Sequence, residues 1–108
     1  MDNMHTYTEY TFPGGETIKC TVAFRFLPKL REHNKRIYTK LNHALINGVD
    51  ELLETAYILY GSYLCACFAG ENGGIENIMS EDDFINALED DLISVMQTCN
   101  SFLNKRKN

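Results

Sequence analysis

The feature that most constrains the fold of this chain is an uncharged run of 16 residues, Thr55–Gly70. Apolar side chains would cover almost every face of a helix formed by this run, and such a helix is buried by neighbours on several sides. A membrane-spanning helix needs about 20 apolar residues, whereas this run is shorter and contains Gly61 and Ser62. We therefore predict a buried core helix at about residues 50–69.

A β-hairpin is predicted ahead of the helices, at about residues 6–24. From Ile18 to Phe24, apolar residues alternate with other residues at a period of two, which is typical of a strand with one face on the core. The turn falls at Pro13-Gly14-Gly15-Glu16, because glycine supplies the positive backbone angles of a tight turn.

A helix at about residues 28–46 is predicted to follow the hairpin. Pro28 is suited to a first turn, where its missing N–H costs nothing. Leu30, Asn34 and Ile37 begin a stripe along one side of this helix. Asn47-Gly48 ends it, because both residue types tolerate a left-handed cap.

A last helix is predicted at about residues 81–104, with a frayed basic tail at 105–108. Ser80 can accept a hydrogen bond from the backbone N–H of Asp83 and so cap the helix. Three acids follow the cap in the first turn, where the helix dipole favours negative charge. The predicted fold class is α+β: one domain, residues 1–108, with an N-terminal hairpin packed on a mainly α core of about three helices.

Charge is unevenly distributed along the chain, although the net charge is only −5. Residues 1–48 contain seven Lys and Arg against four acids, whereas residues 49–104 contain eleven acids and no Lys or Arg. Such a chain can neutralise itself internally, stack head to tail with copies of itself, or simply present solvated helix faces.

Neither catalysis nor metal binding is predicted from the residue types and their spacing. Cys65 and Cys67 would point about 200° apart on a helix, so they cannot both ligate one ion. His33 and His43 would lie about 15 Å apart along a helix axis, and His5 is isolated. We expect no enzyme activity, no metal and no cofactor.

The cysteine context predicts reduced, buried thiols in a cytoplasmic protein. Cys20, Cys65, Cys67 and Cys99 all lie within apolar patterns, and we expect no signal peptide. We expect neither membrane insertion nor nucleic-acid binding, because the chain is net acidic and its basic face lacks interleaved aromatics.

Three segments resemble the short tail assembly chaperones of siphophages and prophages. Thr17–Phe26 is similar to their second strand leading into a helix, Tyr57–Ala66 to their apolar helix, and Met79–Phe84 to the start of their last helix. The resemblance covers about residues 8–104 and consists of the order and length of elements. It implies a non-catalytic protein of the bacterial host cytoplasm that coats the helical tape-measure protein during tail assembly, contacts the tail-tube protein and forms homo-oligomers.

The partner-binding residues that we expect are Tyr57, Tyr60 and Tyr63, whose hydroxyl groups need water or a polar partner. Two other classes of function stay open at this point. The acidic segment suits an inhibitor or regulator of a host protein that mimics the charge of DNA, and the cysteines suit a small enzyme subunit or redox protein.

Overall fold

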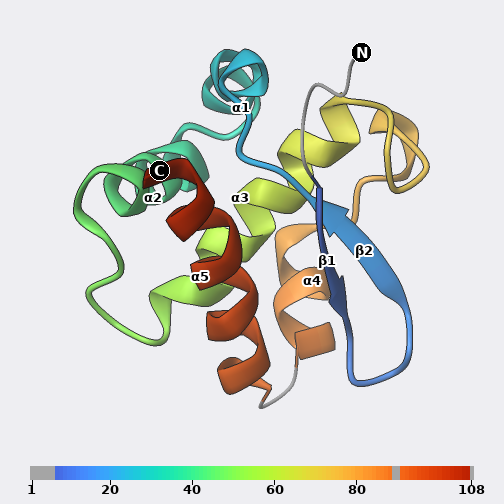
Figure 1. Cartoon of the computed structure of the whole chain (residues 1–108). Coiled ribbons are helices and arrows are strands. Elements are labelled where there is room, and N and C mark those ends of the chain that lie inside the picture. The colour runs from blue at the N-terminus through green and yellow to red at the C-terminus, as the bar shows by residue number, and fades with distance from the viewer. Residues whose placement is uncertain (1–6, 89–90, 108) are drawn as a thin grey trace.

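The computed structural model describes residues 7–88 and 91–107 of the chain. In these residues an antiparallel hairpin precedes five helices (Figure 1). The elements are β1 (Thr8–Thr11), β2 (Thr17–Cys20), α1 (Leu27–His33), α2 (Lys35–Asn47), α3 (Glu54–Phe68), α4 (Glu81–Leu88) and α5 (Leu92–Lys107), with short 3-10 turns at Phe24–Phe26 and Ile75–Asn77. The predicted α+β class with an N-terminal hairpin is confirmed, but the prediction of about three helices is wrong.

The hairpin places Tyr10 opposite Ile18, and both side chains are buried. Gly15 has a φ of 105° and donates its N–H to the carbonyl of Phe12, so one glycine of the predicted pair makes the turn. The alternation does not extend to Phe24, which begins the 3-10 turn with 73% of its surface exposed. Thr21 and Val22, which follow β2, are both buried, so the alternation ends with the strand at Cys20.

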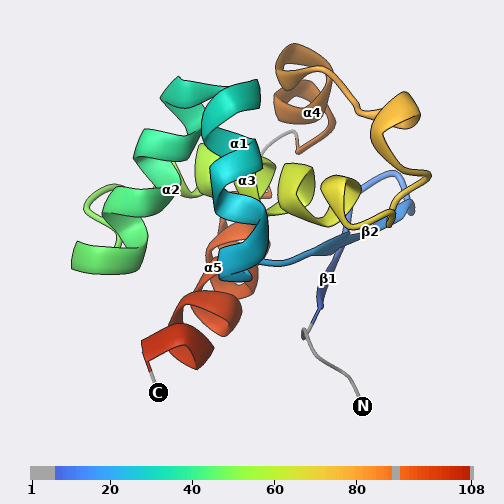
Figure 2. The same cartoon turned by 90° about the horizontal axis from the view of Figure 1, so that it is seen from above.

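Helix α3 occupies the centre of the molecule, with α1 and α2 beside it and the hairpin at one end (Figure 2). Twelve of its fifteen residues are buried, as expected for a helix that is apolar on all faces. Gly61 permits close contact with α2, because a Cβ atom there would lie 3.1 Å from Cγ2 of Ile37. None of the helices in the described ranges is long and apolar enough to cross a membrane.

Asn34 divides the helix that was predicted at residues 28–46. Its backbone leaves the helical region, with φ −154° and ψ 88°, and its side-chain oxygen accepts a hydrogen bond from the N–H of Ile37. Asparagine competes for backbone donors in this way and therefore favours N-caps over helix interiors. Asn34 ends α1 and caps α2 rather than contributing to one continuous stripe.

The helix predicted at residues 81–104 is also divided. The Ser80 cap is confirmed, since the N–H of Asp83 donates to its hydroxyl over 3.1 Å, but α4 ends at Leu88. Asp91 precedes α5 and accepts a hydrogen bond of 2.9 Å from the hydroxyl of Tyr10. Because Asp91 contacts the hairpin in this way, it is not a purely solvated acid. Glu89 and Asp90, the two acids that precede Asp91, lie outside the described residues, as do His5 and Asn108.

Candidate interaction site

Two of the three tyrosines expected to contact a partner lie in the core. Tyr60 and Tyr63 are 4% and 2% exposed, and their rings lie 5.0 and 5.1 Å from that of Phe84. The hydroxyl of Tyr60 donates to the carbonyl of Met79, and the hydroxyl of Tyr63 accepts from the N–H of the same residue, both over 2.8 Å. These hydroxyl groups therefore find their polar partner inside the chain.

Tyr57 is the member of the trio that reaches the surface. Its ring is half-buried and lies 5.7 Å from the guanidinium carbon of Arg36 and 5.3 Å from the ammonium nitrogen of Lys40. Both distances allow a cation–π contact. The site therefore includes Tyr57 on α3 beneath two basic side chains of α2.

The segregated charges meet within the chain. Arg36 forms a hydrogen-bonded ion pair with Glu81, and Lys40 lies 3.2 Å from Glu54. On the other side of the molecule, Lys19 lies 3.4 Å from Glu71. Each pair joins a basic residue of the first 48 positions to an acid of the segment that lacks Lys and Arg. Such pairs contribute little stability at a surface, but they neutralise part of the acidic segment.

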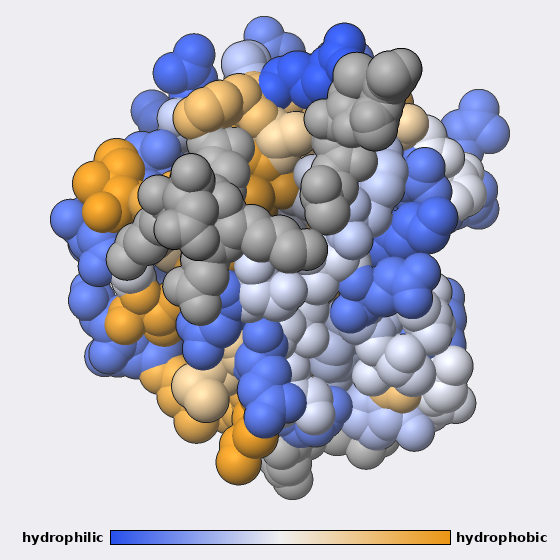
Figure 3. All heavy atoms as spheres, viewed as in Figure 1, coloured by the Kyte–Doolittle hydropathy of each residue, from blue (hydrophilic) through white to orange (hydrophobic). Residues whose placement is uncertain are grey.

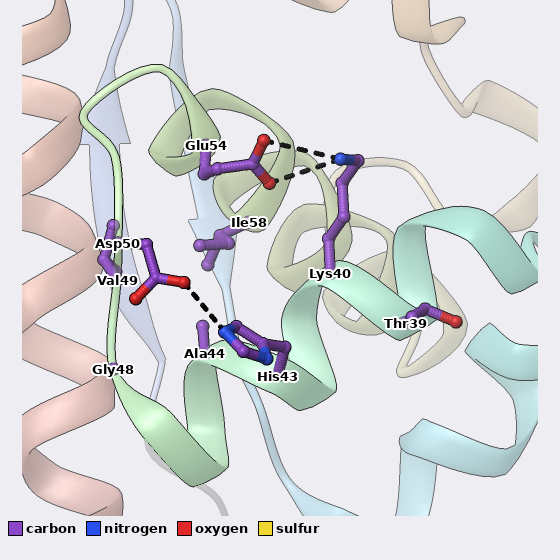
Figure 4. Close-up of a pocket in the computed structure, with 9 residues that line it drawn as sticks. All are labelled: Thr39, Lys40, His43, Ala44, Gly48, Val49, Asp50, Glu54 and Ile58. Atoms are coloured by element: carbon purple, nitrogen blue, oxygen red, sulfur yellow. Dashed lines mark hydrogen bonds and ion pairs between the residues drawn. The ribbon is translucent and has the colours of Figure 1, made fainter.

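A hollow of about 250 Å³ lies between α2, α3 and the segment that joins them (Figure 4). The ion pair of Lys40 with Glu54 lies at one side of it. At the other side, Nε2 of His43 lies 3.1 Å from a carboxylate oxygen of Asp50. The apolar lining comes from Ala44, Val49 and Ile58. The hollow thus combines an apolar lining with a charged rim, which is a common arrangement for binding part of another molecule.

Three large aliphatic side chains are exposed near the same connection. Ile46, in the last turn of α2, is 67% exposed, and Leu52 and Leu53, just before α3, are 44% and 60% exposed. Hydrophobic residues appear in Figure 3 on the side of the molecule where the α2–α3 connection lies. We call Ile46, Leu52 and Leu53 the apolar ridge. No pattern in the sequence singled out these residues, since Leu52 and Leu53 lie between acids just ahead of the uncharged run.

None of the four cysteine thiols is exposed at the surface. All four cysteines are buried and free. Burial raises the pKa of Cys20 and of Cys65 to about 12 and also raises that of Cys99. A reactive cysteine needs the opposite, an exposed thiol with a lowered pKa. Across residues 7–88 and 91–107, no group of three or more His, Cys, Asp or Glu side chains is arranged to hold a metal ion.

Comparison of the chain with known protein families, with curated proteins and with solved structures finds no match.

Proposed function

We propose that this chain is a non-catalytic protein-binding domain of the tail assembly chaperone type. The observation that carries the proposal is the apolar ridge, because three aliphatic side chains are exposed next to a helix pair that has Tyr57 at its surface. Covering aliphatic and aromatic groups at a surface with a partner lowers the free energy of the complex.

The partner that fits this surface best is an amphipathic helix. The ridge and Tyr57 supply contacts for apolar side chains, and the Lys40–Glu54 ion pair and the His43–Asp50 contact supply polar groups beside them. Recognition of a helix through an apolar strip with polar flanks is a recurring mode of binding. The tape-measure protein, which is long and helical, is therefore the first partner to test, and the tail-tube protein is the second.

The rival proposal of an acidic mimic of DNA has less support. Glu54, Glu71 and Glu81 each lie against a basic side chain, so they do not present free negative charge. Internal pairing also weakens the argument that copies of the chain stack through opposite charges. Self-association remains part of the proposal, with the apolar ridge as its contact surface.

The proposal predicts a tape-measure gene next to this one, and the test is co-purification of the chain with overlapping fragments of the protein that such a gene encodes. Leu53→Ser should weaken capture of a helical fragment by about tenfold to a hundredfold, because burying one leucine contributes about 1.5–3 kcal/mol. Ile75→Ser is the matched control, since Ile75 is exposed to a similar extent, 57% against 60%, but lies in the turn after α3.

Several outcomes would contradict the proposal. Equal weakening by the two variants would mean that the ridge is not the contact surface. Failure of every helical fragment to bind, together with competition against DNA for a DNA-binding protein, would favour the mimic instead. Gene order provides an independent check, because a tail-tube gene and a very long tape-measure gene should flank this one.

A further inference from the structure

The hairpin has two outer edges, and the chain itself covers one of them. Strands at the edge of a sheet carry backbone N–H and C=O groups that point away from the partner strand. On β2, the N–H of Lys19 donates to the side-chain oxygen of Asn72 over 2.8 Å, and the carbonyl of Lys19 accepts from the side-chain nitrogen of Asn72 over 2.9 Å. The amide of Asn72 thus replaces the peptide group of a neighbouring strand.

The edge of β1 differs from the edge of β2 in this respect. The N–H of Phe12 donates to the carbonyl of Glu16, so the backbone of Phe12 faces β2. Tyr10, two residues earlier, is paired with Ile18 and faces β2 in the same way. Because inward-facing and outward-facing pairs alternate in an antiparallel ladder, the backbone groups of Glu9 and Thr11 point outward. Among the residues that the structure describes, these backbone groups have no hydrogen-bond partner.

An open groove of about 410 Å³ runs along this edge, between β1 and α5. The α5 side of the groove consists of uncharged polar residues at helical spacing, namely Ser94, Gln97, Thr98 and Ser101. Thr98 donates its hydroxyl to the carbonyl of Ser94 and can still accept a hydrogen bond. Figure 3 shows a pale band of intermediate hydropathy between α5 and β1. The groove therefore offers hydrogen-bonding groups, with neither a large apolar surface nor a strong charge on its helical side.

We propose that an extended peptide segment of another protein, with short polar side chains, binds in this groove as a third strand next to β1. The backbone groups of Glu9 and Thr11 hold its main chain, and the hydroxyl and amide groups of α5 contact its Ser, Thr or Asn side chains. Addition of a strand to an exposed edge is an established mode of peptide recognition. This surface is separate from the apolar ridge, so the proposal stands independently of the proposed function.

A second copy of the chain is a poorer occupant than a single peptide. Two β1 strands paired across a twofold axis would lie about 4.8 Å apart. Each copy would also bring its own α5 to the other side of the groove, and packed helices need about 8–10 Å between their axes. A lone extended segment brings no second helix to the groove.

The experiment uses a pool of octapeptides built from Ser, Thr, Asn, Gly and Val, passed over the immobilised full-length chain. Thr11→Pro removes the outward N–H of β1, whereas Thr11→Val keeps it. Both variants lose the contact of 2.8 Å between the hydroxyl groups of Thr11 and Thr17, so they are matched. Loss of one main-chain hydrogen bond should weaken the retained peptides by about tenfold in Thr11→Pro relative to Thr11→Val.

A second measurement does not depend on how well the proline variant folds. The amides of Glu9 and Thr11 in the unmodified chain should exchange more slowly when a retained peptide is added. Two series of that peptide can be made, with the backbone nitrogens methylated at the odd-numbered residues in one and at the even-numbered residues in the other. Methylation should abolish binding in only one of the two series. The proposal is overturned if no peptide is retained, if both methylated series bind equally, or if Glu9 and Thr11 become protected through concentration-dependent dimerisation without peptide.

Discussion

Tyr60 donates a hydrogen bond from its hydroxyl to the backbone carbonyl of Met79, 2.8 Å away, and so ties the middle of α3 to the residue before the cap of α4. Tyr63 accepts from the N–H of Met79, also over 2.8 Å. Both backbone groups of one residue are thus satisfied by tyrosines one turn apart, which positions the start of α4 on α3.

Removing either hydroxyl should destabilise the fold without changing its apolar packing. We expect Tyr60→Phe and Tyr63→Phe each to lower the free energy of unfolding by about 1–2 kcal/mol, because a polar group of Met79 loses its partner. Tyr57→Phe is the control, because its ring is only half-buried and the described residues give its hydroxyl no hydrogen bond. Equal effects of all three changes in urea unfolding would contradict the assigned role of Met79.

These tyrosines illustrate how far the sequence can predict this site. Their spacing identified three hydroxyl groups on an apolar helix, but it did not identify their partners, because Met79 approaches α3 only after the chain has folded back. The buried helix, the hairpin and the Ser80 cap depend on local patterns and were predicted correctly. The breaks at Asn34 and between α4 and α5 were missed, because apolar periodicity continues on both sides of each. The Asn34 cap competes with that pattern locally, whereas the bond from Tyr10 to Asp91 joins residues far apart in the sequence.

The Ser80 cap provides a second test of local structure. We expect Ser80→Ala to lower the free energy of unfolding by about 1 kcal/mol, because the N–H of Asp83 loses its acceptor. Ser80→Asp should retain most of the stability, since a carboxylate also caps and interacts favourably with the helix dipole. Chemical denaturation of the three proteins would measure the difference. Equal midpoints for the serine and alanine forms would mean that the cap contributes nothing.

Burial of the four cysteines predicts slow thiol modification. In the folded protein, a thiol reagent should label Cys20, Cys65, Cys67 and Cys99 only as fast as the chain opens. In urea all four should react rapidly. The melting temperature should be the same with and without a reductant, since no loop-closing bond is lost. Rapid labelling of the native protein at neutral pH would contradict the packing around α3.

Stability should fall at alkaline pH because of buried tyrosine and cysteine. Burial raises the pKa of Tyr60 from 10.0 to about 12, with a further contribution from Glu81. Between these two values the unfolded chain releases a proton that the folded chain retains, so the free energy of unfolding decreases as pH rises. The buried thiols act in the same direction from about pH 9, since burial also raises their pKa. Urea midpoints should therefore decline above about pH 9, and less steeply in Tyr60→Phe.

Asn72 should show how the chain protects the outer edge of β2. Its φ of 59° lies in the left-handed region, which asparagine tolerates better than most residues. Asn72→Gly keeps this backbone geometry but loses both hydrogen bonds to Lys19, whereas Asn72→Ala loses the bonds and adds backbone strain. We therefore expect the free energy of unfolding to decrease from the natural chain to the glycine variant and further to the alanine variant.

The amide of Lys19 should exchange faster in both Asn72 variants, because its acceptor is gone. The amide of Ile18 faces β1 and provides the internal control, since its environment in the ladder is unchanged. If the edge of β2 becomes available for pairing, both variants should also aggregate at lower concentration than the natural chain. Unchanged exchange at Lys19 would mean that the side chain of Asn72 does not cover this edge in solution.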